Sequence, residues 1–213
     1  MYTPEQIAEM VAERAKNEVG YVGDNGVNAK VPYKTNKFFK VLDSIKGFYN
    51  TKKNGYDWCA GFVDAVQLTV LGEDVMKKIT FHTDCGAGVG FAYRQYEAKK
   101  RIYKTPKVGD EVFYYKVATH TWQHTGMVVE VTGNRFTTVE GNCSNSVKTY
   151  TKVLGQDTKY VEYFGRPDWN TASSLVNKTE TEKELISQIE PLIADIETAA
   201  GKIGEIIKEI AKK

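Results

Sequence analysis

The sequence is poor in several features that would place it in a special class of protein. Only three cysteines occur among 213 residues, and this odd number argues against a full disulfide framework and leaves at least one free thiol. Lysine plus arginine (29) nearly balance aspartate plus glutamate (27), so the formal net charge is only +2. No strong positive field therefore makes nucleic acid the default partner. No apolar run is long enough to span a bilayer.

The N-terminal segment lacks the parts of a secretion signal. It carries no basic start, no apolar core and no small-residue cleavage site. Instead, Thr3 stands at a capping position, Pro4 follows at the first helical position, and apolar residues then recur at helical spacing. These signals predict a helix from Thr3 to Val19. Because the parts of a secretion signal are missing, we expect the protein to reside in the cytoplasm at first.

The main part of the chain reads as helices followed by strands. A buried helix is expected to begin near Cys59, because the residues that follow it are almost all apolar, and another is expected over residues 90–104. From Pro106 onward the chain changes to short β-rich runs, at 111–117, 124–131 and 136–142, separated by turn signals. This order predicts an α+β fold.

The C-terminal part differs in composition. Residues 170–181 are polar and without periodicity, which predicts a linker after a catalytic domain at 1–169. Residues 182–213 carry apolar side chains at alternating spacings of three and four, which predicts an amphipathic helix that Pro191 should kink or interrupt. Docking on the domain or on copies of itself is favoured over attachment to a membrane surface or another partner.

Candidate catalytic residues are few, because the chain has only three histidines, His82, His120 and His124. A cysteine hydrolase needs a thiolate, an imidazole and a third polar group that holds the imidazole. His124 begins a strand with a β-branched, apolar sequence, which is a rigid mount for a base. Cys59 begins a convincing helix, where the positive helix end favours a thiolate. His82 and His120 lie among loop residues.

The third group is expected on the strand that follows His124. A hairpin turn at 132–134 would bring Glu140 beside His124, because residues equidistant from a tight turn face one another. The amide of Asn142, two residues further on, is an alternative partner for the imidazole N–H. Cys143 follows this turn and reads as a packing or incidental residue.

Other motifs in the chain predict no cofactor and no metal site. The glycine stretch after Cys85 lacks the Lys-Ser/Thr of a phosphate-binding loop. His82, Asp84 and Cys85 lie in one short loop without a distant second pair of ligands, so they do not predict a zinc site.

Five segments together carry a resemblance to a known family. In chain order they read "YDWCAGFVDAV", "TPKVGDEVFYY", "HTGMVVEV", "VEGNCSNSV" and "YFGRPDW". They resemble the CHAP family, the cysteine- and histidine-dependent amidohydrolases and peptidases of bacterial cell-wall turnover, from about Thr3 to Trp169. The resemblance implies a papain-like α+β fold, with N-terminal helices packed on an antiparallel sheet, to which this chain adds its C-terminal amphipathic helix.

The resemblance also implies a reaction and a site. The reaction is hydrolysis of an amide bond in peptidoglycan, at the muramoyl-L-alanine bond or in the stem or cross-bridge peptide. Cys59 matches the nucleophile, His124 the base and Glu140 the group that orients the base, while Asn142 is an adjacent polar residue of the same cluster. Some members bind calcium just upstream of the nucleophile, where this chain has lysines in place of acids, so calcium is not expected.

The remaining expectations concern the cleft and the biological setting. The aromatic side chains of Tyr56, Trp58 and Trp122 are candidates for the substrate cleft. Peptidoglycan is the expected partner, and the C-terminal helix is a candidate for self-association or envelope contact. An antimicrobial phage lysin of the endolysin type fits a chain without a secretion signal. The alternatives are an injected antibacterial amidase effector and a non-catalytic wall-binding or scaffold module.

Overall fold

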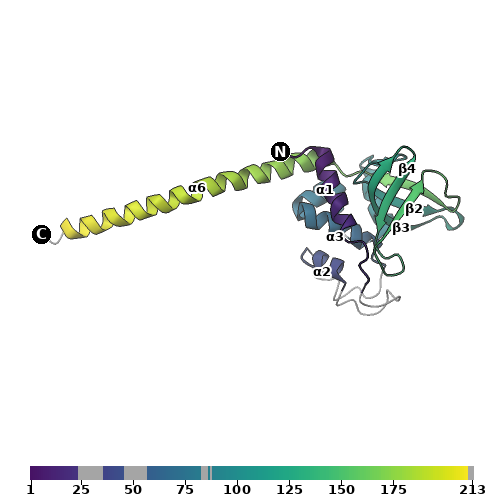
Figure 1. Cartoon of the computed structure of the whole chain (residues 1–213), viewed down its shortest axis with the longest axis horizontal. Coiled ribbons are helices and arrows are strands. Elements are labelled where there is room, and N and C mark those ends of the chain that lie inside the picture. The colour runs from purple at the N-terminus through teal and green to yellow at the C-terminus, as the bar shows by residue number, and fades with distance from the viewer. Residues whose placement is uncertain (24–35, 46–56, 83–85, 87, 211–213) are drawn as a thin grey trace. The chain divides into compact units, whose positions relative to one another are not determined.

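A computed structural model of the chain describes residues 1–23, 36–45, 57–82, 86 and 88–210. Residues Tyr2–Ser173 form one compact unit, and Ser174–Lys213 belong to a second. The first unit begins with helices and continues with a sheet, so the predicted α+β order is confirmed (Figure 1). Its helices are α1 (Pro4–Lys16), α2 (Lys37–Asp43), α3 (Cys59–Leu71), α4 (Glu73–Thr80) and α5 (Val89–Ala98).

Helix α1 starts where the sequence predicts. The Thr3 hydroxyl accepts a hydrogen bond from the Gln6 backbone N–H at 3.2 Å, and the Gln6 side chain accepts one from the Thr3 N–H at 2.8 Å. This reciprocal pair satisfies two backbone donors that a helix start leaves free, and Pro4 supplies none. The helix ends at Lys16, earlier than the predicted Val19.

Helix α3 is the central helix of this unit. Eleven of its thirteen residues are buried, including Phe62, Val63 and Val66, and it packs against α1, α2 and strand β3 (Thr121–Thr132). Each such side chain contributes about 1.5–3 kcal/mol through burial. The helix is therefore a rigid support for the residue at its first position, Cys59.

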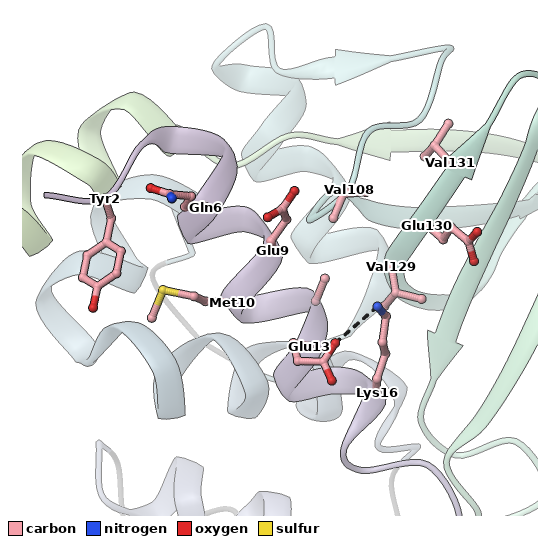
Figure 2. A pocket seen from close by; sticks show the side chains of 11 residues that line it. Tyr2, Gln6, Glu9, Met10, Glu13, Lys16, Val108, Val129, Glu130 and Val131 are labelled. Carbon is pink, nitrogen blue, oxygen red and sulfur yellow. Dashed lines mark ion pairs between the residues drawn. The ribbon is translucent and has the colours of Figure 1, made fainter.

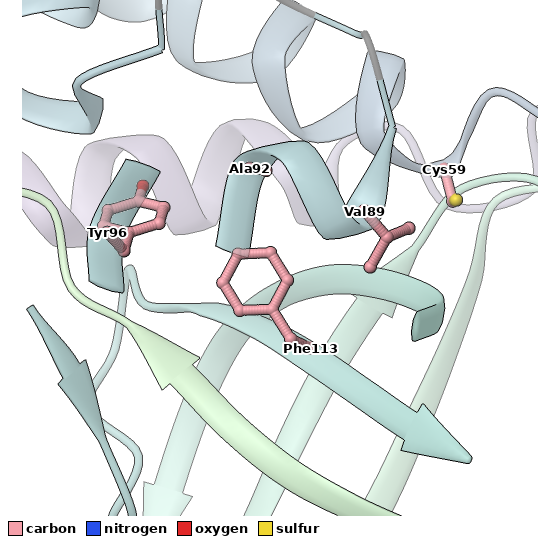
Figure 3. Packing of buried hydrophobic residues seen from close by; sticks show 5 residues of the cluster. All are labelled: Cys59, Val89, Ala92, Tyr96 and Phe113. Carbon is pink, nitrogen blue, oxygen red and sulfur yellow. The ribbon is translucent and has the colours of Figure 1, made fainter. Parts of the chain in front are cut away.

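Within the part of the chain that the structure describes, the sheet has six antiparallel strands in the order β1-β6-β2-β3-β4-β5. The strands other than β3 are β1 (Ile102–Tyr103), β2 (Glu111–Lys116), β4 (Arg135–Glu140), β5 (Lys148–Val153) and β6 (Tyr160–Gly165). On β2, Phe113 belongs to a cluster with residues of α5 and with Cys59 of α3 (Figure 3), whereas Val112 and Tyr114 pack with other strand residues. Because side chains alternate along a strand, one face of the sheet packs on the helices and the other face holds a second apolar cluster.

A buried polar cluster joins α3 to the sheet. The Nδ1 atom of His82 lies 2.9 Å from Oδ1 of Asp64 on α3, and the Thr125 hydroxyl of β3 donates to Oε1 of Glu111 at 2.8 Å. The second ring nitrogen of His82 lies 3.9 Å from Oε2 of Glu111. Burial raises the pKa of Glu111 to about 8, and the Asp64 charge adds to this while His82 and Thr125 oppose it. Burial lowers the pKa of His82, but Asp64 and Glu111 outweigh it and raise the pKa above its ordinary value.

The C-terminal helix α6 runs from Trp169 to Ile210, so two sequence expectations are corrected. Residues 170–181 are helical and not irregular, because a polar composition without Gly or Pro does not prevent a helix. The helix also continues through Pro191 without an interruption. Trp169 at its start is buried, whereas seven large apolar side chains further along the described part of the helix are exposed: Leu185, Ile186, Ile189, Leu192, Ile193, Ile196 and Ile203. Among the described residues, no helix combines the length and the apolar character needed to cross a membrane.

Helix α5 differs from its predicted bounds of 90–104. It ends at Ala98, Lys100 takes a left-handed backbone conformation with φ of 56°, and Ile102–Tyr103 pair with β6 as strand β1. Helical periodicity continues past Ala98 in the sequence, but the backbone turn at Lys100 ends the helix.

Candidate active site

Cys59 occupies the first position of α3, as predicted. The preceding Trp58 is the N-cap, and its side chain makes no capping hydrogen bond. The Cys59 residue is only 4% exposed. The free backbone N–H groups and the positive end of the helix dipole favour a negative charge at this position, which for cysteine is the thiolate.

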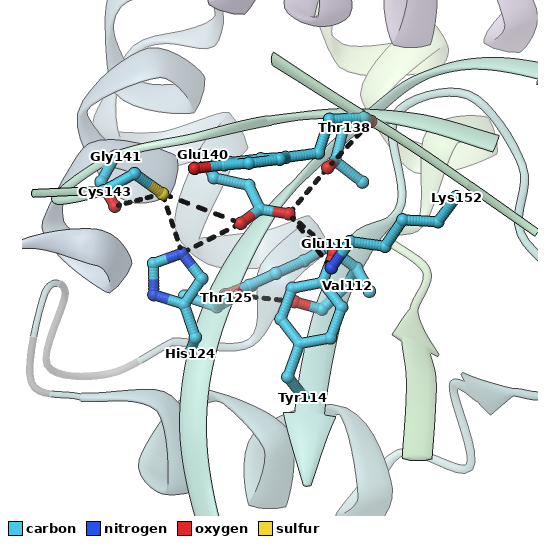
Figure 4. A network of polar contacts seen from close by, with 11 residues as sticks. Glu111, Val112, Tyr114, His124, Thr125, Thr138, Glu140, Gly141, Cys143 and Lys152 are labelled. Atoms are coloured by element: carbon cyan, nitrogen blue, oxygen red, sulfur yellow. Dashed lines mark hydrogen bonds and ion pairs between the residues drawn. The ribbon is translucent and has the colours of Figure 1, made fainter. Parts of the chain in front are cut away.

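His124 and Glu140 lie side by side on the hairpin of β3 and β4. The two strands pair antiparallel through the predicted turn, and Nε2 of His124 lies 3.0 Å from Oε2 of Glu140 (Figure 4). Glu140 is 3% exposed. The hairpin thus brings together the imidazole and the carboxylate that the sequence pairs, and it gives Nε2 a hydrogen-bond acceptor.

The other carboxylate oxygen of Glu140 is also held. Its Oε1 accepts hydrogen bonds from the Tyr114 hydroxyl and the Thr138 hydroxyl, both at 2.6 Å, and lies 3.8 Å from Nζ of Lys152. Burial raises the pKa of Glu140, but the hydrogen bond with His124 and the charges of Lys152 and His124 outweigh it and lower the pKa to about 2. The carboxylate is therefore ionised and fixed in orientation.

Two glycines make this arrangement possible. A Cβ atom at Gly126, two residues after His124, would lie 2.5 Å from Cγ of Glu140. A Cβ atom at Gly141 would lie 2.4 Å from Cβ of Phe62 on α3. Since real Cβ atoms do not approach so closely, a larger residue at either position would displace Glu140 or the start of α3.

Contacts with two thiols and a carboxylate raise the pKa of His124. Burial lowers this pKa, but hydrogen bonds with Cys143, Cys59 and Glu140, together with the charge of the Cys59 thiolate, raise it to about 12. The environment therefore favours the imidazolium form of His124, which is the form that can give a proton to a leaving group.

Cys143 is the residue that sequence reasoning missed. Its Sγ lies 3.4 Å from Nε2 of His124 and 3.7 Å from Oε2 of Glu140, so its interpretation as an incidental residue is corrected. The available signal was its position immediately after the turn that carries Glu140 and Asn142.

The structure places Asn142 near the start of α3. Its side-chain amide donates a hydrogen bond to Oδ1 of Asp57 at 3.0 Å, two residues before Cys59. Nε2 of His124 contacts Glu140. Of the two partners expected from the sequence, the carboxylate is therefore the one that pairs with the imidazole.

The aromatic candidates for the cleft have different outcomes. Trp58 is 2% exposed, stacks on Phe38 and donates from Nε1 to Asn145 at 3.2 Å, so it packs in the core and its expected place in the cleft is corrected. Trp122 is partly buried and stacks on Tyr93 at 3.9 Å between ring centroids. Tyr56 lies outside the described residues.

A polar cavity opens beside the hairpin. Its volume is about 350 Å³, and it is lined by Tyr114, His124, Glu140, Asn142, Cys143, Ser144, Tyr150, Lys152, Asp157 and Tyr160. A larger cavity of about 650 Å³ lies between α1 and β3, with Met10, Val108 and Val129 in its lining (Figure 2). That cavity contains none of the candidate catalytic side chains, so the smaller one is the cavity that matters for chemistry.

Residues 51–142 match the CHAP domain family, and this range spans Cys59, His124 and Glu140. This chain contains a CHAP domain. The match confirms the resemblance to the CHAP family found in the sequence. No curated protein matches the sequence.

Two solved structures resemble the chain. The crystal structure of Ly7917 matches at 12% identity with a TM-score of 0.44, and it covers 75% of this chain and 62% of the Ly7917 chain. The crystal structure of Ly7917 with the hydrolyzing product of MDP matches at 11% identity with a TM-score of 0.43, over 76% and 62% of the two chains. The present chain thus spans less than two thirds of Ly7917, and similarity at this level says nothing about its activity.

Proposed function

We propose that this CHAP domain hydrolyses an amide bond of peptidoglycan, at the muramoyl-L-alanine bond or in the stem or cross-bridge peptide. The observation that carries the proposal is the pairing of His124 with the buried carboxylate of Glu140 at 3.0 Å, in an environment where Cys59 contributes to the raised pKa of the imidazole. The same three residue types, in the same roles, form the thiolate sites of cysteine hydrolases.

In the proposed reaction, the Cys59 thiolate attacks the scissile carbonyl carbon, and a C–S bond forms. The proton of the His124 imidazolium passes to the leaving amine as the C–N bond breaks, which leaves a thioester. Water then loses a proton to the imidazole and attacks the thioester, and the departing sulfur becomes the thiolate again. Because Nε2 of His124 is engaged by Glu140, the proton exchanged with substrate is the one on Nδ1.

The tetrahedral intermediate needs donors for its oxyanion. The backbone N–H of Cys59 is a candidate, because it lies in the first turn of α3, where N–H groups lack an intrahelical partner. Asn142, whose amide contacts Asp57, supports the loop that enters this turn. Trp122, which packs against the cluster that contains Cys59, remains a candidate for substrate contact.

Mass spectrometry of fragments released from purified peptidoglycans of defined chemotype tests this function. An amidase releases stems with a free alanine amine from the glycan, whereas an endopeptidase leaves stems on the glycan and divides the peptide. Neither fragment should appear without enzyme or with Cys59→Ala. If folded wild-type protein releases no fragment from any chemotype, the non-catalytic wall-binding or scaffold alternative replaces the proposal.

We place the enzyme in a phage lysin, and an injected antibacterial effector is the alternative setting. The tail helix is proposed to mediate self-association or envelope contact, because its apolar side chains from Leu185 to Ile203 are exposed. Light scattering of the chain with and without residues 174–213 separates these ideas. A cut at Ser174 keeps the buried Trp169 and Ala172 in the catalytic unit. A smaller assembly after the cut supports self-association. If both forms are monomeric, binding of the full chain to lipid vesicles tests envelope contact instead.

A further inference from the structure

Three different ligand atoms converge at the wall of the polar cavity. Sγ of Cys143 lies 3.4 Å from Nε2 of His124, Nε2 lies 3.0 Å from Oε2 of Glu140, and Oε2 lies 3.7 Å from Sγ. All three therefore lie within 4.8 Å of one another, as one ion requires. His124 and Glu140 take part in the proposed reaction, whereas Cys143 has no role in it.

The triangle has the dimensions of one face of a tetrahedral zinc site. With Zn–S of about 2.3 Å and Zn–N and Zn–O of about 2.1 Å, a tetrahedron has S···N, N···O and S···O edges of about 3.6, 3.4 and 3.6 Å. The observed edges of 3.4, 3.0 and 3.7 Å each differ from these by about 0.4 Å or less. Small side-chain shifts would therefore complete the geometry.

The outer contacts also suit a metal ligand. Tyr114 and Thr138 donate to Oε1 of Glu140 and leave Oε2 directed at His124 and Cys143. Such hydrogen bonds fix a ligating carboxylate in metalloproteins. Lys152, 3.8 Å from Oε1, opposes a cation, and its Nζ also lies over the Tyr114 ring at 3.6 Å. This charge limits the affinity without blocking the ligand atoms.

We propose that Cys143, His124 and Glu140 bind Zn²⁺ and that this cation inhibits the enzyme. A thiolate with an imidazole and one carboxylate suits zinc, whereas calcium and magnesium take oxygen ligands. The ion enters through the cavity of about 350 Å³ that all three residues line, where the fourth position is open to water. The sequence predicted no metal site, because these ligands come from separate positions on the β3–β4 hairpin and the turn after it.

Zinc binding changes the state of the base. The protons on Sγ of Cys143 and on Nε2 of His124 leave to solvent as the two Zn bonds form. His124 then cannot become an imidazolium, and Glu140 no longer accepts a hydrogen bond from it. The inhibition rests on the proposed function, whereas the binding itself does not.

Direct binding tests the site with Zn²⁺ and Co²⁺ as probes and no substrate. Two variants that each retain one thiol form a matched pair: Cys59→Ala/Cys85→Ser keeps Cys143, and Cys59→Ala/Cys143→Ser keeps Cys85. Calorimetry with zinc should give one ion per chain for the first variant, and at least about tenfold weaker binding for the second. Co²⁺ should give a thiolate charge-transfer absorption only in the first. Circular dichroism checks that both are folded.

Two results would overturn the site. One is equal zinc affinity in the two variants, or a charge-transfer absorption that persists without Cys143. The other is a folded first variant that binds no zinc in the millimolar range. A rise in melting temperature with added zinc should likewise appear only where Cys143 is present.

Activity gives a separate readout of inhibition. Fragment release by wild type should fall with added zinc and return with a chelator, and Cys143→Ser, compared with its own zinc-free rate, should need at least about tenfold more zinc for half inhibition. Equal sensitivity of the two proteins contradicts the inhibitory role. A wild-type protein that binds zinc but never releases fragments refutes the hydrolase proposal and leaves the metal site standing.

Discussion

Replacement of Glu140 by glutamine tests whether this carboxylate orients the imidazole of His124, the proposed base. In the structure, Oε1 of Glu140 accepts hydrogen bonds from Tyr114 and Thr138, and Oε2 faces Nε2 of His124. A glutamine that keeps its oxygen toward the two hydroxyls turns its NH₂ group toward Nε2. Two donors then face each other, so Nε2 must lose its proton and the neutral ring carries its proton on Nδ1. That tautomer cannot take a proton from Cys59.

The expected loss is large. A carboxylate-to-amide change that enforces the wrong tautomer costs about 10⁴-fold in kcat in a comparable triad, and we expect a loss of about 10²–10⁴-fold for Glu140→Gln. The protein should remain folded, because two hydrogen bonds to the side-chain oxygen are kept. Loss of the charge-assisted bond to His124 should lower the free energy of unfolding by about 1.5–3 kcal/mol.

Two assays measure this effect independently. The first is the rate of fragment release from purified peptidoglycan. The second is the rate of alkylation of Cys59 by iodoacetamide, followed by peptide mass spectrometry, which needs no substrate and reports the thiolate fraction. Glu130→Gln, an exposed change on the neighbouring strand β3, is the control and should match wild type in both. Wild-type rates for Glu140→Gln in both assays would refute the assigned role of the carboxylate.

Three further predictions concern the supports of the site and of the fold. Gly126→Ala places a Cβ atom 2.5 Å from Cγ of Glu140, so fragment release should fall by about 10²-fold; an unchanged rate would mean that the position of Glu140 is not needed. Asp110→Asn breaks a buried ion pair with Arg166, in which Oδ2 lies 2.7 Å from a guanidinium nitrogen. Urea unfolding should show that the free energy of unfolding falls by about 3–5 kcal/mol, and an unchanged unfolding midpoint would contradict this. Glu111 has a pKa raised to about 8 against 4.5 when unfolded, so the folded state holds an extra proton and stability should decrease as pH rises from 4.5 to 8. Glu111→Gln should show a smaller decrease in melting temperature over that range, and an equal decrease would assign the effect to other groups.

The sequence predicted those parts of the fold that local patterns determine. The capping signals at Thr3 and the apolar run after Cys59 placed the starts of α1 and α3, because a helix start depends on neighbouring residues. Strands β5 and β6 were not predicted. Strand β5 is an exposed edge strand, and β6 pairs with β2, which precedes it by about fifty residues, so neither has a strong local pattern.

The site shows the same division. The turn at 132–134 joins β3 to β4, so the sequence could bring His124 and Glu140 to the same end of the hairpin. The register itself, in which Met127 pairs with Val139 after a shift between Val128 and Glu130, could not be predicted from the turn. The contact of Cys143 with His124 depends on how the chain turns after β4, where Asn142 takes a left-handed conformation with φ of 62°. Trp58 was misplaced because a short aromatic segment gives no sign of whether the ring faces the core or a cleft.

The identity of the nucleophile is the most direct test, because the structure places a second thiol, Cys143, 3.4 Å from the imidazole of His124, the proposed base. The measurement is fragment release from purified peptidoglycan, followed by mass spectrometry, for wild type and Cys59→Ala at equal concentrations of folded protein. We predict that wild type releases amide-cleavage fragments and that Cys59→Ala releases none. Release of the same fragments by Cys59→Ala would contradict the account and would move the nucleophile to another residue.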